Sequence, residues 1–176
     1  LFILSDDQAF NTINALGNKE IQTPNIDRLV HAGVTFTHAY NMGSWQPAVC
    51  VASRIMLNTG RFLWDAKEVE PALKDEQSHG RLWSQYMKSA GYETYMSGKW
   101  HVTGIDPKDI FDHVRGVRPG MPNQTPQGYN RPHPEKKDLW SPWETHFEGY
   151  WKGGTHWSEV LGNHGVEFIS HTTHSE

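Results

Sequence analysis

Helix-like and strand-like segments alternate along the first part of this chain, and this alternation restricts the folds open to it. Residues 1–4 form a short apolar run that ends in Ser-Asp-Asp, as a buried parallel strand does at its carboxyl end. A helix is expected directly after Thr23, a residue type that caps helices, with Pro24 in its first position and Gly33 at its end. Residues 34–38 then alternate and are rich in β-formers.

A second helix is expected over about 78–90, because apolar residues recur there at helical spacing, and a strand over 92–97 follows it. Two strand–helix–strand units favour an α/β fold with a mostly parallel sheet flanked by helices. In such a fold, residues 1–4, 34–38 and 92–97 are neighbouring strands. A third helical pattern runs over 157–169.

The size and charge of the chain exclude several classes of protein. Its 176 residues suffice for one domain, 1–176, with a Pro- and Trp-rich loop insertion at about 104–155. A net charge of -4 argues against a nucleic-acid partner, and no apolar run reaches the length of a membrane span. Because the chain opens inside an apolar strand, we expect its true N-terminus and any targeting segment to be missing.

Cys50 is the only cysteine and stands just before a helix-like run. A helix N-terminus favours anions and ionised thiols, although most lone cysteines are buried small hydrophobes. Arg54 follows one helical turn later, so it shares a face with Cys50 and suits either an anionic ester or a surface ion pair. Lys99 and His101 follow the strand over 92–97 and lie on the same side if the chain stays extended, and they offer a positive charge and a proton carrier.

Asp6 and Asp7 follow the first apolar run, at the strand end where open α/β sheets bind ligands. Adjacent carboxylates repel each other and therefore need a cation or strong hydrogen bonds. Their hard oxygens favour Ca²⁺ or Mg²⁺, whereas a solvated turn is the alternative. Gln8 is a weaker candidate ligand. Asp6, Cys50 and Lys99 are expected to meet at one edge of the sheet.

Four stretches resemble the type I sulfatase family, in the family's order. The family signature is matched by Cys50-Val51-Ala52-Ser53-Arg54, closed by Thr59-Gly60-Arg61. Residues 1–8, 23–36 and 91–101 are similar to the family's first strand, first helix and second signature. Two positions depart from the pattern: Ala52 replaces the commoner proline and Asn58 the usual leucine. Ala52 is typical of motifs matured by the radical, oxygen-independent enzyme.

The resemblance implies the N-terminal part of an alkaline phosphatase-like sulfatase that hydrolyses sulfate esters. Cys50 would be converted to formylglycine, whose hydrated aldehyde attacks sulfur. Asp6, Asp7 and the modified Cys50 would bind Ca²⁺, with Mg²⁺ less favoured. Arg54 and Lys99 would offset sulfuryl charge, and His101 would assist the release of sulfate.

The resemblance also implies partners and a location. The partners would be a sulfate-ester substrate, including a sulfated polysaccharide, and a formylglycine-installing maturation enzyme. The location would be periplasmic or secreted. Two alternatives stay open: a phosphoesterase or phosphonate hydrolase of the same superfamily, which Ser or Thr at position 50 would favour, and an inactive truncated binding domain.

The remaining candidates carry weaker signals. Residues of the substrate cleft could come from His113, Arg115, Arg118 and His133, and sugar stacking from Trp140, Trp143 and Trp151, although packing is the commoner role of such aromatics. His171 and His174 make a poor metal site. A Ca²⁺ site needs about six to eight oxygens, and the resemblance implies that further ligands come from beyond residue 176, so we expect this chain alone not to turn over sulfate esters.

Overall fold

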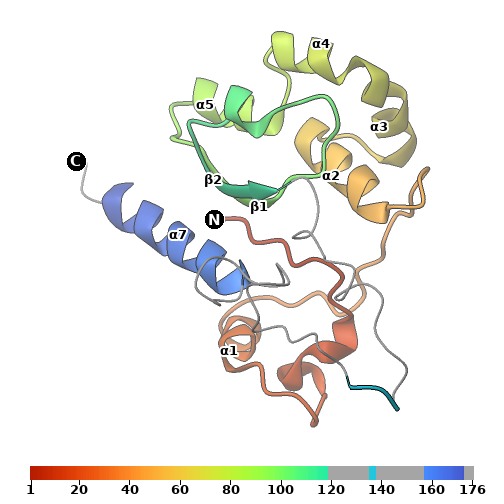
Figure 1. Ribbon diagram of the computed structural model, residues 1–176, viewed down its shortest axis with the longest axis vertical. Helices are drawn as coiled ribbons and strands as arrows, with labels where there is room; N and C mark the ends of the chain where they lie inside the picture. The colour runs from red at the N-terminus through yellow and green to blue at the C-terminus, as the bar shows by residue number, and fades with distance from the viewer. Residues whose placement is uncertain (119–134, 138–156, 173–176) are drawn as a thin grey trace. The chain divides into compact units, whose positions relative to one another are not determined.

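The computed structural model describes residues 1–118, 135–137 and 157–172 (Figure 1). The chain divides into two compact units, Leu1–Gly43 and Ser44–Glu176. The first contains the 3-10 helices η1 (Phe10–Thr12) and η2 (Asn14–Leu16) and the helix α1 (Pro24–Ala32). The helix predicted after Thr23 is thereby confirmed.

The start of α1 is held by side chains rather than by a conventional cap. Thr23 makes no capping hydrogen bond; its hydroxyl accepts from the Asn14 N–H at 2.9 Å and donates to Asp27 at 2.8 Å. The same carboxylate of Asp27 accepts from the Ala15 N–H at 2.9 Å. These bonds tie η2 to α1, and the Gly33 N–H closes the helix on the Leu29 carbonyl.

The strands predicted over 1–4 and 34–38 are wrong for this structure, which forms no strand within residues 1–43. A strand needs backbone partners and an apolar face to cover. No residue of this unit is buried, and Leu1, Ile3 and Phe36 are 76% exposed or more. The apolar runs therefore lack the neighbouring strands that would make them part of a sheet.

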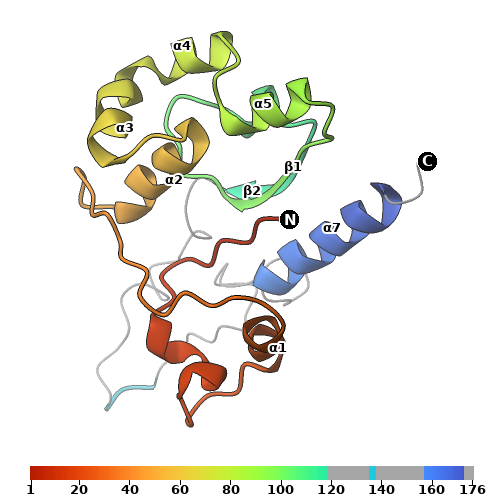
Figure 2. The ribbon, with the colours of Figure 1, turned by 180° about the vertical axis from the view of Figure 1, so that it is seen from behind.

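The second unit contains a small parallel sheet between helices (Figures 1 and 2). Its elements, in chain order, are α2 (Val49–Thr59), α3 (Leu63–Val69), η3 (Glu70–Ala72), α4 (Leu73–Ser78), α5 (Trp83–Ser89), β1 (Tyr95–Lys99), η4 (Pro107–Asp109), β2 (His113–Arg118) and α7 (Trp157–Thr172). The strands β1 and β2 pair in parallel, which confirms the fold class. Helices α2 and α5 lie on one side of the sheet and α7 on the other.

Two predictions in this unit need correction. The helix expected over about 78–90 is shorter, because α4 ends at Ser78 and Gly80 turns with a positive φ of 68° before α5 begins. The irregular stretch expected from residue 104 contains η4 and the whole of β2. The prolines that predicted an irregular stretch lie outside this part, since residues 108–118 contain none. The helix expected over 157–169 is confirmed as α7.

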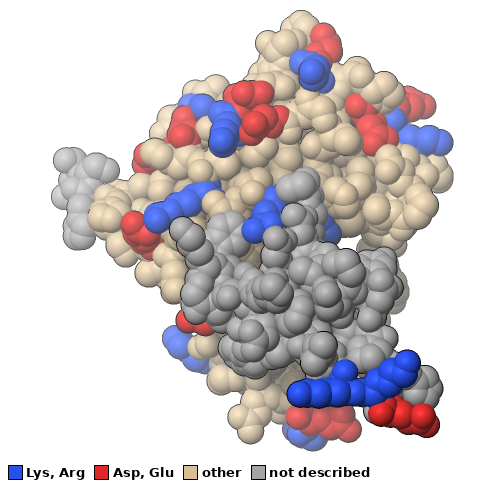
Figure 3. All heavy atoms as spheres, viewed as in Figure 1, with Lys and Arg blue, Asp and Glu red and all other residues tan. Residues whose placement is uncertain are grey.

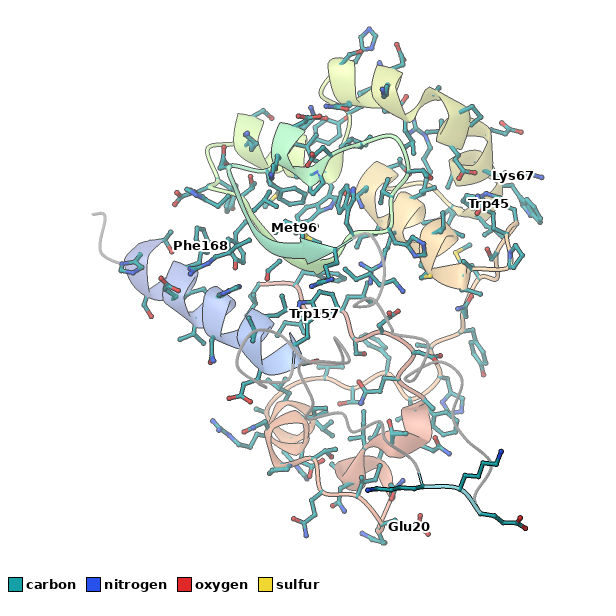
Figure 4. The ribbon with its side chains drawn as sticks, in the orientation of Figure 1. Glu20, Trp45, Lys67, Met96, Trp157 and Phe168 are labelled. Atoms are coloured by element: carbon teal, nitrogen blue, oxygen red, sulfur yellow. The ribbon has the colours of Figure 1, made fainter. Side chains whose placement is uncertain are left out.

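The core lies between the sheet and helices α2, α3 and α5. Ile55, Leu82 and Ile110 are fully buried, and Trp100 packs edge-on against Phe111 with ring centroids 6.0 Å apart. On the other side, Phe168 points from α7 toward the sheet and stacks on Tyr95 (Figure 4). This packing fixes the N-terminal half of α2 beside the end of β1.

A buried carboxylate joins α4 to the turns around it. Glu76 is 5% exposed and accepts from Arg61 and from Arg81, both at 2.8 Å. On the face drawn in Figure 3, several groups contain both basic and acidic side chains. The bond from Arg81, followed by that from Arg61, lowers the pKa of Glu76 from 4.5 to about 2.

Removing this charge should destabilise the protein. We expect Glu76→Gln to lower the free energy of unfolding by about 2–3 kcal/mol, because two guanidinium groups lose a buried partner. The matched control is Asp75→Asn, which removes a carboxylate that is 56% exposed and should cost less than about 1 kcal/mol. Urea unfolding followed by circular dichroism measures both; equal losses would contradict a special role for Glu76.

The carboxylate of Glu76 should also make the free energy of unfolding depend on pH in the acid range. Because its pKa is 4.5 when unfolded and about 2 when folded, its contribution is complete above pH 4.5 and is lost as the pH falls through about 2. The difference in unfolding free energy between wild type and Glu76→Gln should therefore shrink over this window. A difference that stays constant would show that Glu76 keeps its ordinary pKa.

Candidate active site

Cys50 is the second residue of α2, which confirms its predicted place at a helix N-terminus. The side chain is half-buried, and its Sγ lies 3.1 Å from Nδ1 of His101. The two residues come from the first and second signature stretches, 51 positions apart. The fold thus brings a nucleophile-type side chain and a proton carrier into direct contact.

His101 reaches Cys50 through a turn, not along an extended chain. Its φ of 50° lies in the left-handed region that few non-glycine residues adopt. The chain therefore does not stay extended through His101, so the condition under which Lys99 and His101 would share one side is not met. The turn directs the chain away from the sheet after Trp100, whose ring is 6% exposed and whose Nε1 donates to the Ile105 carbonyl at 2.8 Å.

Arg54 ties α2 to the end of β1. The residue is only 8% exposed, so it is not the surface side chain that one reading of the sequence allowed. Its Nη1 donates to the backbone carbonyl of Lys99 at 2.6 Å. Lys99 is half-buried and pairs in register with Arg118 of β2. Arg54 therefore joins the two signature stretches through one short hydrogen bond.

The rest of the first signature shapes and anchors α2. Asn58, at the position where the family usually has leucine, is 3% exposed and donates to the Arg54 carbonyl at 2.8 Å. Gly60 ends the helix in the left-handed conformation, with a φ of 66°, and its N–H bonds to the Met56 carbonyl. Arg61 then binds Glu76. The departure at Asn58 is thus accommodated inside the helix.

The chain segment that precedes Cys50 is held by a glutamate that the sequence did not indicate. Glu70 accepts hydrogen bonds from Trp45 Nε1 at 2.7 Å and from Gln46 Nε2 at 2.8 Å. Figure 4 shows Trp45 beside α3. A lone glutamate at the end of a helix gives no pattern that predicts this contact.

Asp6 and Asp7 belong to the first unit and are exposed. Asp7 has a φ of 55°, and the acidic pair sits in a bend, not at a strand end. Their meeting with Cys50 and Lys99 stays a prediction, as does a role for Gln8. Within the described part of the chain, no three His, Cys, Asp or Glu side chains form a cluster that could hold a metal ion.

Of the weaker candidates, Arg118 is the in-register partner of Lys99, whereas His113, Arg115 and His171 lie elsewhere in the second unit. His113 binds Glu93 at 2.6 Å and Arg115 binds Glu167 at 2.6 Å, and these four residues, with His171, help to line a groove of about 640 Å³ beside α7. Neither Cys50 nor His101 lines this groove. His133, Trp140, Trp143, Trp151 and His174 lie outside the described residues.

The chain belongs to the sulfatase family, whose pattern it matches over residues 1–176. It is 33% identical to the N-acetylglucosamine-6-O-sulfatase of Bacteroides thetaiotaomicron over 64% of this chain and 19% of that protein. It is also 33% identical to mouse arylsulfatase J, over 66% of this chain and 19% of that protein. The ulvan-active sulfatase of Formosa agariphila is 28% identical over 73% of this chain and 24% of that protein.

These matches span only about a fifth to a quarter of each relative's length. No solved structure matches the chain at a significant level. Among the described helices, none is long and apolar enough to cross a membrane.

The tie between Arg54 and Lys99 can be tested by mutation. Arg54→Met should lower the free energy of unfolding by about 1–3 kcal/mol, because the Lys99 carbonyl loses a charged donor. Arg115→Met is the matched control, since its ion pair is 51% exposed and should contribute less than about 1 kcal/mol. Chemical denaturation of both variants measures the difference, and a smaller loss for Arg54→Met than for Arg115→Met would refute the tie.

Proposed function

We propose that this chain carries the nucleophile and the proton carrier of a sulfatase active site. In this proposal Cys50 is converted to formylglycine, and the enzyme hydrolyses a sulfate ester. The observation that carries the proposal is the 3.1 Å contact between Cys50 Sγ and His101 Nδ1. Family membership supports the reaction class, because the signature that surrounds Cys50 is the one in which sulfatases modify a cysteine.

The neighbouring side chains suit the charge of the reaction. The net reaction splits an S–O ester bond with water and leaves an alcohol and sulfate, so negative charge must be held throughout. Arg54 lies one turn from Cys50 on the same helix face, and Lys99 is two residues from His101. Their roles are to hold sulfuryl oxygens, while His101 moves a proton at Nδ1, its ring atom nearest residue 50.

Calcium fits the donor chemistry of the acidic pair. The carboxylates of Asp6 and Asp7 are exposed and adjacent, and hard oxygens are the ligands that Ca²⁺ prefers over softer metals; Mg²⁺ is the second choice. Together with residue 50 they would supply part of the set of about six to eight oxygens. When bound, the ion offsets the negative charge of the sulfate group.

A sulfated carbohydrate is the substrate class that we propose. Relatives named as an N-acetylglucosamine-6-O-sulfatase, an N-acetylgalactosamine-6-O-sulfatase and an ulvan-active sulfatase support it. A periplasmic or secreted location and a maturation enzyme for Cys50 belong to the same proposal and rest on the resemblance of the signature.

Mass spectrometry of the peptide that contains Cys50 tests the modification directly. Conversion replaces the thiol sulfur by an aldehyde oxygen and removes two hydrogens, so the peptide becomes lighter and reacts with hydrazides. The protein should be co-expressed with an oxygen-independent maturation enzyme, since Ala52 is typical of its targets. An unmodified thiol under these conditions would contradict the proposal, and turnover of a phosphate ester in its place would favour the phosphoesterase alternative.

Mutation of His101 tests the proton carrier. His101→Asn in the matured enzyme should lower kcat by about 10²–10⁴-fold, because proton transfer at residue 50 is lost. The control is His79→Asn, which alters a histidine directly after α4 whose side chain is 58% exposed and should leave kcat unchanged. Release of an aryl alcohol from its sulfate ester measures both. A wild-type kcat in His101→Asn would remove His101 from the mechanism.

A further inference from the structure

The segment that leads into Cys50 is held by one carboxylate. Glu70 uses both of its oxygens on two consecutive side chains, accepting from Trp45 Nε1 at 2.7 Å with Oε2 and from Gln46 Nε2 at 2.8 Å with Oε1. All three residues are half-buried. A carboxylate that accepts two N–H donors makes stronger hydrogen bonds than a neutral acceptor.

The backbone of Glu70 is itself hydrogen-bonded to residues of the core. Its backbone N–H donates to the carbonyl of Ala66, which is fully buried in α3, and its carbonyl accepts from Leu73, which is 2% exposed. The residue therefore stands between two members of the hydrophobic core. The side chain that it presents to Trp45 and Gln46 starts from a rigid backbone.

The held segment is short and leads directly to the reacting residue. Trp45 packs against the core, and three residues, 47–49, separate Gln46 from Cys50. The helix begins at once, since the Val51 N–H already bonds to the Ala48 carbonyl at 3.1 Å. Cys50 is thus held from both sides, by Glu70 before it and by the bond from Arg54 to Lys99 after it.

The geometry points to Glu70 as a positioning residue for residue 50. This inference rests on the proposed function, because it takes residue 50 as the reacting group. Glu70 binds Trp45 and Gln46, so it acts on residue 50 through the segment that these two residues begin. It fixes the path of residues 45–49 and thereby the distance between residue 50 and His101. An error of about 1 Å in such a distance can cost about a hundredfold in rate.

The test compares Glu70→Gln with Glu68→Gln in the full chain. A glutamine at position 70 keeps the shape of the side chain but has only one acceptor oxygen. Its NH₂ group would face one of the two N–H donors, so one hydrogen bond is lost. Glu68 is exposed on α3, so its substitution makes the same charge change away from the segment. Hydrogen exchange over the peptide 44–53 should become about tenfold faster in Glu70→Gln, as expected for loss of bonds to a charged acceptor, and stay unchanged in Glu68→Gln.

Kinetics of the matured enzyme separate positioning from simple stability. Glu70→Gln should lower kcat about tenfold to a hundredfold with little change in KM, since the substrate contacts remain while residue 50 is displaced. Trp45→Phe keeps the ring but loses the donor. If the two changes act through one hydrogen bond, the loss of kcat in the double variant, expressed as a free energy, is smaller than the sum of the losses in the two single variants.

The outcomes distinguish this inference from the proposed function. An unmodified Cys50 would defeat the proposed function, whereas exchange over 44–53 would still decide whether Glu70 holds the segment. The positioning role of Glu70 would be overturned if hydrogen exchange in Glu70→Gln were as slow as in the wild type. It would also be overturned if exchange were faster but kcat stayed unchanged. If Glu70→Gln fails to fold, Gln46→Ala removes one donor without altering η3 and is read in the same way.

Discussion

The hydrogen bond from Arg54 to the carbonyl of Lys99 is the interaction on which the site depends. At 2.6 Å, from a guanidinium that is 8% exposed, it joins a helix to the end of a strand. A buried cation is costly unless its donors are satisfied, so the arrangement restricts α2 to one position along β1. The contact between Cys50 and His101 follows from that position, because each stands a few residues from the bonded pair.

The hydrophobic core makes this bond possible. Ile55 lies on α2 next to Arg54 in sequence and is fully buried, while Trp100 follows Lys99 and is 6% exposed. Both belong to one cluster that also contains Leu82 and Ile110. Each signature stretch therefore contains both residues that pack in the core and residues that contact the other stretch.

Sequence reasoning succeeded where local pattern and tertiary structure agree. The helix after Thr23, the helix that carries Cys50 and the helix over 157–169 follow from caps and apolar spacing. It failed over 1–4 and 34–38, because apolar runs become strands only when a neighbouring strand pairs with them. The contact between Cys50 and His101 could be anticipated from two motifs. Glu70 could not, since its partners lie 24 and 25 positions earlier and no local pattern joins them.

A crystal structure of the matured protein grown with Ca²⁺ would test the central claim most directly, namely that residue 50 is the reacting group and shares its site with the acidic pair. The account predicts formylglycine at position 50, His101 within hydrogen-bond reach of it, and oxygens of Asp6 and Asp7 about 2.3–2.6 Å from the metal. An unmodified Cys50, or a metal bound away from residue 50, would contradict the account.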